Sequence, residues 1–349
     1  MPWFYGDGGF ALTSRFAAVA ATWILWRPLL AQAASPLNYL QSSGSKADHV
    51  LPLMWAVLVI SIVVIVVIGA LLGGAIWHRP GMIAAPAQRL PVIQETSGLN
   101  WLWIGVGIST LALLFTIVWT VKVLAAIAAP PMPPPLTIEV TGRQWWWQVR
   151  YLDPNASHSF TTANEIHIPV GTPVQFRLIG GDVIHSFWIP RLTGKTDLIP
   201  GQTNELWLDA KSPGIYRGQC TEYCGLEHAK MQMLVIADTP ADFAAWRAHQ
   251  EQSPAMPTGI ASTGHTAFGT YCGSCHAVRG TEAAGVLGPD LSHLMQRRTL
   301  AAGILPNTHD NRWAWIADPQ AIKPGNLMQR PELSAQELVS IRAYLETLN

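Results

Sequence analysis

Two long apolar segments dominate the pattern of hydrophobic and polar positions along the chain. Residues 51–77 carry no charged side chain, and residues 100–124 carry one lysine close to their end. Either segment, built as a helix that rises about 1.5 Å per residue, is long enough to cross about 30 Å of hydrocarbon. Trp101 and Trp119 lie near the ends of the second segment, where aromatic side chains favour a membrane interface. The pattern predicts a transmembrane helical hairpin over residues 45–128, and the length of the segments disfavours the alternative of a buried soluble helix.

A shorter apolar stretch lies near the N-terminus. It follows Arg15, and Ala31 and Ala33 satisfy the small-residue rule of signal-peptide cleavage. We therefore predict a signal peptide over residues 1–34. An uncleaved membrane segment is the alternative, because an Arg-Pro pair interrupts the apolar run. Basic residues between the two long segments favour the inside of the membrane, which places both ends of the hairpin outside.

A proline-rich linker at residues 129–135 separates the hairpin from a region with a different pattern. Short runs of strand-forming residues, separated by Gly, Pro and Asp turns, predict a compact all-β domain over residues 136–238. The runs with this pattern are residues 136–140, 165–168, 174–179, 205–208 and 233–236.

Helical patterns return after this domain. They predict a helix at residues 241–249 and, after a linker rich in Ser, Pro, Gly and Thr at residues 251–264, a helical domain at residues 262–349. Ser334 followed by Glu337 is a capping box that marks the start of the last helix.

The composition supports membrane attachment and excludes one class of partner. Only 13% of the residues are charged, whereas about 25% is usual in soluble proteins. The formal net charge is zero and no run is rich in lysine and arginine, so we expect no nucleic-acid partner. The four cysteines fall into two close pairs, and each pair lies within a longer pattern of cofactor ligands.

The first cysteine pair belongs to the pattern C-x3-C-x3-H-x2-M. It consists of Cys220, Cys224, His228 and Met231, and His185 lies upstream. Two thiolates, two imidazoles and a thioether are ligands that copper favours. A second cysteine at this spacing lets two thiolates bridge two copper ions, which spreads one electron over both metals. Two alternatives remain: a thioredoxin-like copper chaperone, which needs a βαβ alternation that is not seen, and a structural zinc site, for which methionine is a poor ligand.

This segment resembles the dinuclear CuA loop of the cytochrome c oxidase subunit II family, and the resemblance covers about residues 45–238. It implies a cupredoxin-like fold for the all-β domain, with Cys220 and Cys224 as the bridges between the coppers. The remaining ligands that it implies are His185 and Met231 on one copper, and His228 and the backbone carbonyl of Glu222 on the other.

The same resemblance assigns two further roles. The carboxylate of Glu222 resembles the family's ligand to a magnesium ion that is shared with the catalytic subunit. Trp145, in the aromatic segment of residues 142–147, matches the tryptophan through which electrons enter from cytochrome c. The family usually has histidine where this chain has Arg143, and this departure does not affect a metal ligand.

The second cysteine pair belongs to the haem attachment motif C-x-x-C-H, formed by Cys272, Cys275 and His276. With its neighbouring helical patterns, the region resembles a class I cytochrome c domain. The resemblance implies covalent haem c on the two cysteines and His276 as the proximal iron ligand. It further implies that the carbonyl of Pro289 accepts from the ring of this histidine and that Met328 is the sixth ligand.

Alternatives remain open for this region. His293 and Met295 are the rival sixth ligands, and Met328 could instead be a methionine of the core. The cysteine pair could also form a disulfide.

Together the resemblances imply a multidomain membrane protein of the kind found in caa-type oxidases: a two-helix hairpin, a cupredoxin-like CuA domain and an all-α cytochrome c domain. Such a subunit relays electrons from haem c to CuA and on to a separate haem-copper catalytic subunit I, which reduces O2 to water and pumps protons. We expect that subunit, other oxidase subunits, a soluble or membrane cytochrome c donor and membrane lipid as partners. The expected location is the cell (inner) membrane as a multi-pass protein, with both cofactor domains on the outer, periplasmic side. The alternatives are a nitric oxide reductase subunit, a membrane-anchored electron carrier and a copper-handling protein.

Overall fold

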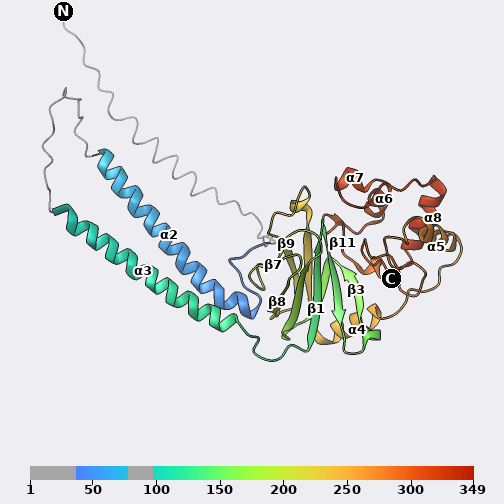
Figure 1. Ribbon diagram of the computed structural model, residues 1–349, viewed down its shortest axis with the longest axis horizontal. Helices are drawn as coiled ribbons and strands as arrows, with labels where there is room; N and C mark the ends of the chain where they lie inside the picture. The colour runs from blue at the N-terminus through green and yellow to red at the C-terminus, as the bar shows by residue number, and fades with distance from the viewer. Residues whose placement is uncertain (1–36, 78–96) are drawn as a thin grey trace, which may run out of the picture. The chain divides into compact units, whose positions relative to one another are not determined.

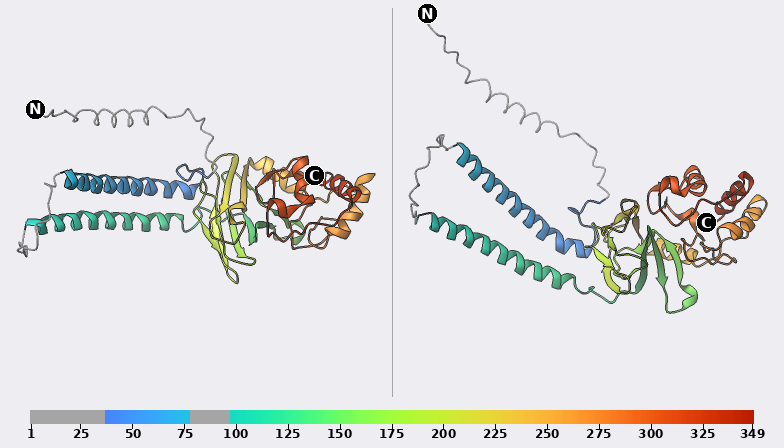
Figure 2. Two further views of the ribbon diagram at one scale, coloured as in Figure 1. Left: turned by 90° about the horizontal axis from the view of Figure 1, so that it is seen from above. Right: turned by 45° about the horizontal axis from the view of Figure 1, so that its top comes forward.

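The computed structural model describes residues 37–77 and 97–349 of the chain (Figure 1). The predicted signal peptide and the basic loop of the hairpin lie outside the described residues. Two long helices, α2 (Ser45–Trp77) and α3 (Ser97–Ile127), run side by side in all views (Figures 1 and 2). Both are long and apolar enough to cross a membrane, and almost none of their side chains is buried by protein. Apolar side chains that protein leaves uncovered suit contact with lipid, so these helices anchor the chain in a membrane.

The next part of the chain forms a sandwich of two five-stranded sheets. The first sheet has the order β3-β2-β1-β5-β8, with parallel pairing between β1 and β5 and antiparallel pairing elsewhere. Its strands are β1 (Leu136–Arg143), β2 (Trp146–Leu152), β3 (Phe160–Ala163), β5 (Val174–Gly180) and β8 (Thr203–Leu208).

The second sheet has the order β4-β10-β9-β6-β7. Its strands are β4 (Glu165–Pro169), β6 (His185–Trp188), β7 (Thr196–Leu198), β9 (Gly214–Cys220) and β10 (Gln232–Asp238). The parallel pair here is β4 with β10. This architecture is the cupredoxin-like sandwich that the sequence predicts, and each of the five predicted runs lies within a strand.

The core of the sandwich lies between the two sheets. Buried and half-buried residues alternate along β1 and β5, as expected for strands with one face on the core. Ile138, Trp147, Phe176 and Phe187 are completely buried there. Helix α4 (Pro240–Gln250) then packs against β4 and β10, at the place where the sequence predicts a helix.

The outer ends of the two membrane helices are tied to the sandwich next to β8. Asp209 caps α2, because its carboxylate accepts from the backbone N–H of Ser45 at 2.7 Å and from the Ser45 hydroxyl at 2.6 Å. The indole N–H of Trp207 donates to the carbonyl of Ile127 at the end of α3, at 3.1 Å. Polar groups that the helix ends leave free are therefore satisfied by the sandwich.

The C-terminal region is helical, with one short two-stranded ladder. Its elements are α5 (Ile260–Tyr271), β11 (Thr299–Leu300), β12 (Leu305–Pro306), α6 (His309–Ala317), α7 (Pro319–Ile322) and α8 (Ala335–Leu345). The core of this region contains Phe268, Ile341 and Tyr344. Ser334 and Glu337 form the predicted capping box at the start of α8.

The predicted linker is wrong at its C-terminal end, since α5 already begins at Ile260. Gly264, which the sequence places in the linker, lies within α5 and faces α8. A Cβ atom there would lie 1.8 Å from the carbonyl oxygen of Ser340, so glycine is required for the close approach of the two helices. Small residues in this stretch therefore serve helix packing rather than chain flexibility.

Candidate metal and haem sites

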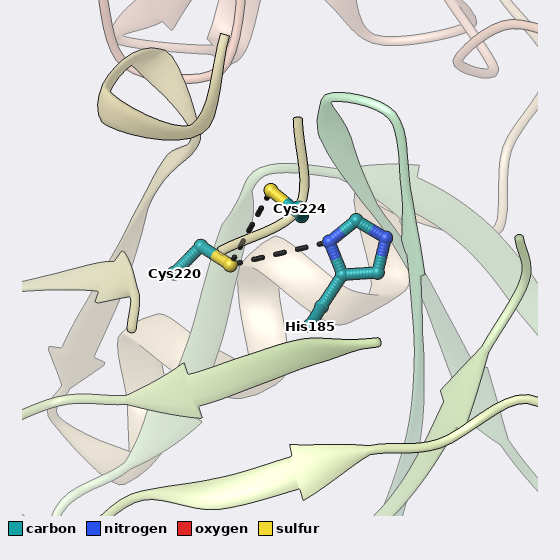
Figure 3. A group of neighbouring side chains, drawn as sticks. All are labelled: His185, Cys220 and Cys224. Carbon is teal, nitrogen blue, oxygen red and sulfur yellow. Dashed lines mark hydrogen bonds between the residues drawn. The ribbon is translucent and has the colours of Figure 1, made fainter. Parts of the chain in front are cut away.

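The C-x3-C loop connects β9 to β10. Cys220 is the last residue of β9, and its backbone N–H donates to the carbonyl of Met231 at 3.0 Å, which closes the loop. His228 begins a short 3-10 helix (His228–Lys230) within the loop, and His185 begins the neighbouring strand β6. Antiparallel pairing of β6 with β9 brings His185 to the two cysteines (Figure 3).

Five side chains of the predicted copper site come together in the structure. The sulfur atoms of Cys220 and Cys224 are 3.8 Å apart and unbonded. Nδ1 of His185 lies 3.9 Å from the Cys220 sulfur, and Nδ1 of His228 lies 3.5 Å from the Cys224 sulfur. The sulfur of Met231 is 3.9 Å from that of Cys224. The backbone carbonyl of Glu222, also predicted as a donor, lies 3.3 Å from the Cys220 sulfur.

The charge state of the two thiols suits a cation. Their mutual hydrogen bond lowers the pKa of Cys220 to about 4 and raises the pKa of Cys224, because two adjacent thiolates repel each other. Both side chains are buried, at 1% and 2% exposure. Full ionisation of the pair therefore needs a positive charge between the sulfurs, and the soft donors around them suit copper.

Asp182 orients His185. Its carboxylate oxygen lies 2.7 Å from Nε2 of the imidazole, which leaves Nδ1 facing the sulfur. Although burial opposes both shifts, this contact raises the pKa of His185 and lowers that of Asp182. The backbone N–H groups of Gln144 and Val183 each donate to the same carboxylate at 2.7 Å. A carboxylate on the far side of an imidazole is a common way to fix the ring of a metal ligand.

Gly142 leaves room for the imidazole of His185. A Cβ atom on Gly142 would lie 2.8 Å from Cδ2 of His185, so β1 packs directly against the ring. The indole of Trp147 covers the ring edge-on, with ring centroids 6.1 Å apart. His185 is completely buried as a result.

Trp145 is joined to the loop by hydrogen bonds. Its indole N–H donates to the carbonyl of Cys224 at 2.9 Å, and the side-chain amide of Gln144 donates to the same carbonyl at 2.7 Å. Gly225, with φ of +113°, packs against the indole, where a Cβ atom would lie 3.1 Å from the ring. The predicted electron-accepting tryptophan is therefore in direct contact with the cysteine loop.

The C-x-x-C-H motif follows α5. The side chain of Cys275 is exposed, whereas burial raises the pKa of the half-buried Cys272 to about 11. Nδ1 of His276 donates to the carbonyl of Pro289 at 2.8 Å, which leaves Nε2 as the free ring nitrogen. Burial lowers the pKa of His276 and so favours the neutral imidazole that binds iron. Gly288 packs on this ring, since a Cβ atom there would lie 2.5 Å from Cε1.

The Met328 turn is the segment of residues 323–328, held by two amide side chains. Asn326 accepts from the backbone N–H of Met328 at 2.8 Å and donates to the carbonyl of Lys323 at 2.6 Å. Gln320 donates to the carbonyls of Asn326 and Met328, both at 2.8 Å. Gln320 belongs to α7, so the turn is held by this short helix and by its own asparagine. Of the two rivals, His293 is buried, and its Nδ1 donates to the carbonyl of Asn349 at 2.6 Å.

Both regions of the chain match known protein families. Residues 152–238 match the family described as cytochrome c oxidase subunit II, periplasmic domain, and residues 261–349 match the family described as cytochrome c. The chain thus joins a domain that matches the subunit II family, called here the subunit II domain, to a C-terminal domain that matches the cytochrome c family, called here the cytochrome domain. These families imply copper in the subunit II domain and haem in the cytochrome domain.

Individual relatives are named cytochrome c oxidase subunit 2. The chain is 41% identical over 214 residues to cytochrome c oxidase subunit 2 of Alkalihalophilus pseudofirmus, covering 60% of each protein. It is 31% identical over 226 residues to that of Bacillus sp. (strain PS3), covering 61% of this chain and 62% of the relative. The chain thus spans about three fifths of the length of these relatives. The periplasmic domain of subunit II of cytochrome oxidase of Bradyrhizobium japonicum matches with 33% identity and a TM-score of 0.32, over 34% of this chain and 96% of that structure.

The sequence does not predict the supporting roles of several residues around the two sites. Asp182 carries a local signal, since it stands three residues before His185. Gln144 and Lys323 carry none, because their roles depend on contacts between segments that are distant in the sequence. Gln320 acts on carbonyl groups only six and eight positions away.

Proposed function

We propose that this chain is the electron-relay subunit of a haem-copper terminal oxidase. Electrons pass from haem c to dinuclear CuA and on to a separate catalytic subunit that reduces O2 to water and pumps protons. The observation that carries this proposal is the pair of buried, unbonded thiols 3.8 Å apart, with two imidazoles and a thioether around them. A single blue-copper ion needs only one of these cysteines.

The copper donors divide into bridging and terminal groups. Cys220 and Cys224 would bridge two copper ions, with His185 and Met231 on one and with His228 and the Glu222 carbonyl on the other. When bound, the copper pair supplies a one-electron centre. The chain's own contribution is rigidity: β6, β9 and Asp182 hold the donors in place, and burial excludes water from His185, Met231 and the two cysteines.

The cytochrome domain would hold its haem covalently through Cys272 and Cys275. His276 would bind the iron on one side, with its free Nε2 fixed in direction by the hydrogen bond from Nδ1 to Pro289. Met328 would bind on the other side, from the turn that Asn326 shapes. Ligation by histidine and methionine supplies a higher reduction potential than ligation by two histidines, as suits an electron donor.

The carboxylate of Glu222 is accessible at the surface. Its side chain is 44% exposed and lies 3.5 Å from Nζ of Lys195. A carboxylate at this position can reach a magnesium ion shared with the catalytic subunit, while its own backbone carbonyl remains at the copper site. Oxidase subunits, a cytochrome c donor and membrane lipid are accordingly the partners that we propose, with both cofactor domains on the periplasmic side of the cell membrane.

Electron paramagnetic resonance of the purified chain, with optical spectra before and after reduction, tests the proposal. We expect a seven-line copper hyperfine pattern from one electron shared by two coppers, together with the α-band of a covalently attached haem. A four-line pattern of mononuclear copper would contradict the dinuclear site. Haem that is extracted by acidic acetone would contradict covalent attachment.

A further inference from the structure

A buried lysine joins the cytochrome domain to the subunit II domain. Lys323 follows α7 and is only 2% exposed. Its Nζ donates to the backbone carbonyls of Trp145 at 2.6 Å and Lys230 at 2.8 Å, and to that of Ala301 in its own domain at 3.2 Å. An ammonium group has three N–H donors, and here each has a carbonyl acceptor.

A buried glutamate makes the reciprocal connection. Glu165 at the start of β4 is 3% exposed. Its carboxylate accepts from the backbone N–H groups of Arg298 at 3.0 Å and Thr299 at 2.8 Å, and from the Thr299 hydroxyl at 2.8 Å. The backbone N–H of Gln232 also donates to the carbonyl of Ala302, at 3.0 Å. The two domains therefore meet in a hydrogen-bonded contact whose polar side chains are buried.

The lysine holds a specific part of the cytochrome domain in place. Gly325 lies two residues after Lys323 and three before Met328, and it faces the indole of Trp145. A Cβ atom at Gly325 would lie 3.7 Å from the indole ring. On another side the same indole contacts Gly225 of the cysteine loop. Trp145 thus lies between the Met328 turn and the copper loop, and its side chain is 8% exposed.

We propose that Lys323 is a positioning residue that locks the Met328 turn onto Trp145, so that electrons from the chain's own haem enter the copper site through this tryptophan while external donors are kept from it. The inference rests on the proposed function. In the step concerned, one electron passes from the reduced haem to the oxidised copper pair, and no bond forms or breaks.

Charged neighbours of Lys323 are few. Glu227 and Lys230 of the copper loop act on it with opposite sign, and Cys224 adds a weaker influence. Burial is the largest effect and lowers the pKa of Lys323 to about 7. Its geometry, with three carbonyl acceptors, holds the side chain in place.

The substitution Lys323→Met keeps the unbranched apolar part of the side chain and removes its donors. The matched control is Lys211→Met, because Lys211 is 54% exposed and pairs only with Asp48 among the contacts described for its side chain. The docking is measured by hydrogen exchange at the backbone amides of Gln232 and Thr299, in the full chain loaded with copper and haem. We expect exchange to become at least about tenfold faster in Lys323→Met and to stay unchanged in the control. A tenfold change corresponds to about 1.4 kcal/mol, within what the loss of hydrogen bonds from a charged donor costs.

Flash reduction of the haem in the same samples tests the electron route, because the rate of the following copper reduction can be measured. The rate of copper reduction should fall at least about tenfold in Lys323→Met, because small displacements of reacting groups have effects of this size. Unchanged exchange would overturn the docking role, and faster exchange with an unchanged electron-transfer rate would overturn the route through Trp145.

A second variant covers the case in which Lys323→Met does not fold. Glu165→Gln places an amide against the N–H groups of Arg298 and Thr299, and it should also speed exchange of the Gln232 amide at least about tenfold. An unchanged exchange rate of the Gln232 amide in Glu165→Gln would overturn the docked interface. A chain that binds neither copper nor haem would refute the proposed function, whereas exchange measured on that unloaded full chain would still test the docking.

Discussion

Asp182 provides a test of how the chain holds its copper donors. The substitution Asp182→Asn keeps the size of the side chain and removes its charge. One carboxylate oxygen of Asp182 accepts from the Val183 N–H and contacts Nε2 of His185, and the other accepts from the Gln144 N–H. An amide has one oxygen and one NH2 group, so in either orientation it presents a donor to a group that needs an acceptor.

The magnitude follows from these contacts. If the NH2 group faces His185, the imidazole takes the tautomer that puts its proton on Nδ1, the nitrogen that would bind copper. If it faces Gln144 instead, a backbone N–H at an exposed position loses its acceptor, which costs about 0.5–1.5 kcal/mol. Loss of such a supporting group typically weakens metal binding about 10–100-fold, or about 1.4–2.8 kcal/mol.

Competition with a copper chelator of known affinity measures this effect on the purified chain. Asp310→Asn is the matched control, because it makes the same change in charge at a side chain that is 99% exposed. We expect weaker copper binding in Asp182→Asn alone, with a changed hyperfine pattern from the His185 side of the site. Copper affinity equal to that of the control would refute the argument that Asp182 fixes the imidazole.

Three further predictions concern the cytochrome domain. Gly288→Ala should displace the ring of His276 at a cost of about 1–3 kcal/mol, because the added carbon would lie 2.5 Å from it; an unchanged haem spectrum and thermal midpoint would contradict this. Ser334→Ala removes the cap of α8 and should speed hydrogen exchange in its first turn about fivefold, corresponding to about 1 kcal/mol; restoration by Ser334→Thr is the control. Docking at Lys323 should strengthen as the pH rises from about 7, the pKa of the docked side chain, toward 10.5, the ordinary pKa of lysine. In this range the docked lysine has released a proton that the undocked lysine still binds, whereas below pH 7 both are protonated and docking should stay constant. Exchange protection of the interface, corrected for intrinsic rates, measures this, and Lys323→Met should abolish the dependence.

The sequence predicts those features whose signal is local. The five runs recognised as strands are rich in β-branched or apolar residues, and all lie in strands of the sandwich. Strand β9 (Gly214–Cys220) has a glycine, an arginine and a glutamine in its second half, so its pattern is hidden, and it is defined by pairing with β10 and β6. The spacing of the cysteine loop likewise predicts four of the donors that the structure brings together.

The supporting residues could not be predicted in this way. Lys323 has the sequence context of an ordinary surface lysine, and its burial results from docking against Trp145, which is 178 positions away. Gly264 resembles a linker glycine until α8 is placed against it. In both cases the role depends on which distant segment becomes a neighbour, and local patterns do not encode that.

The burial of the copper donors has a consequence for how the metal is acquired. His185 and Met231 are completely buried and Cys220 and Cys224 are 1% and 2% exposed, so a dissolved ion cannot reach these four donors while the loop is closed. Copper uptake then requires a transient opening of the loop, and its speed is limited by that opening. At high copper concentration the rate of uptake should therefore reach a plateau instead of rising in proportion. The same closure would slow release, so a chelator added later should withdraw the metal at a rate that does not depend on its own concentration.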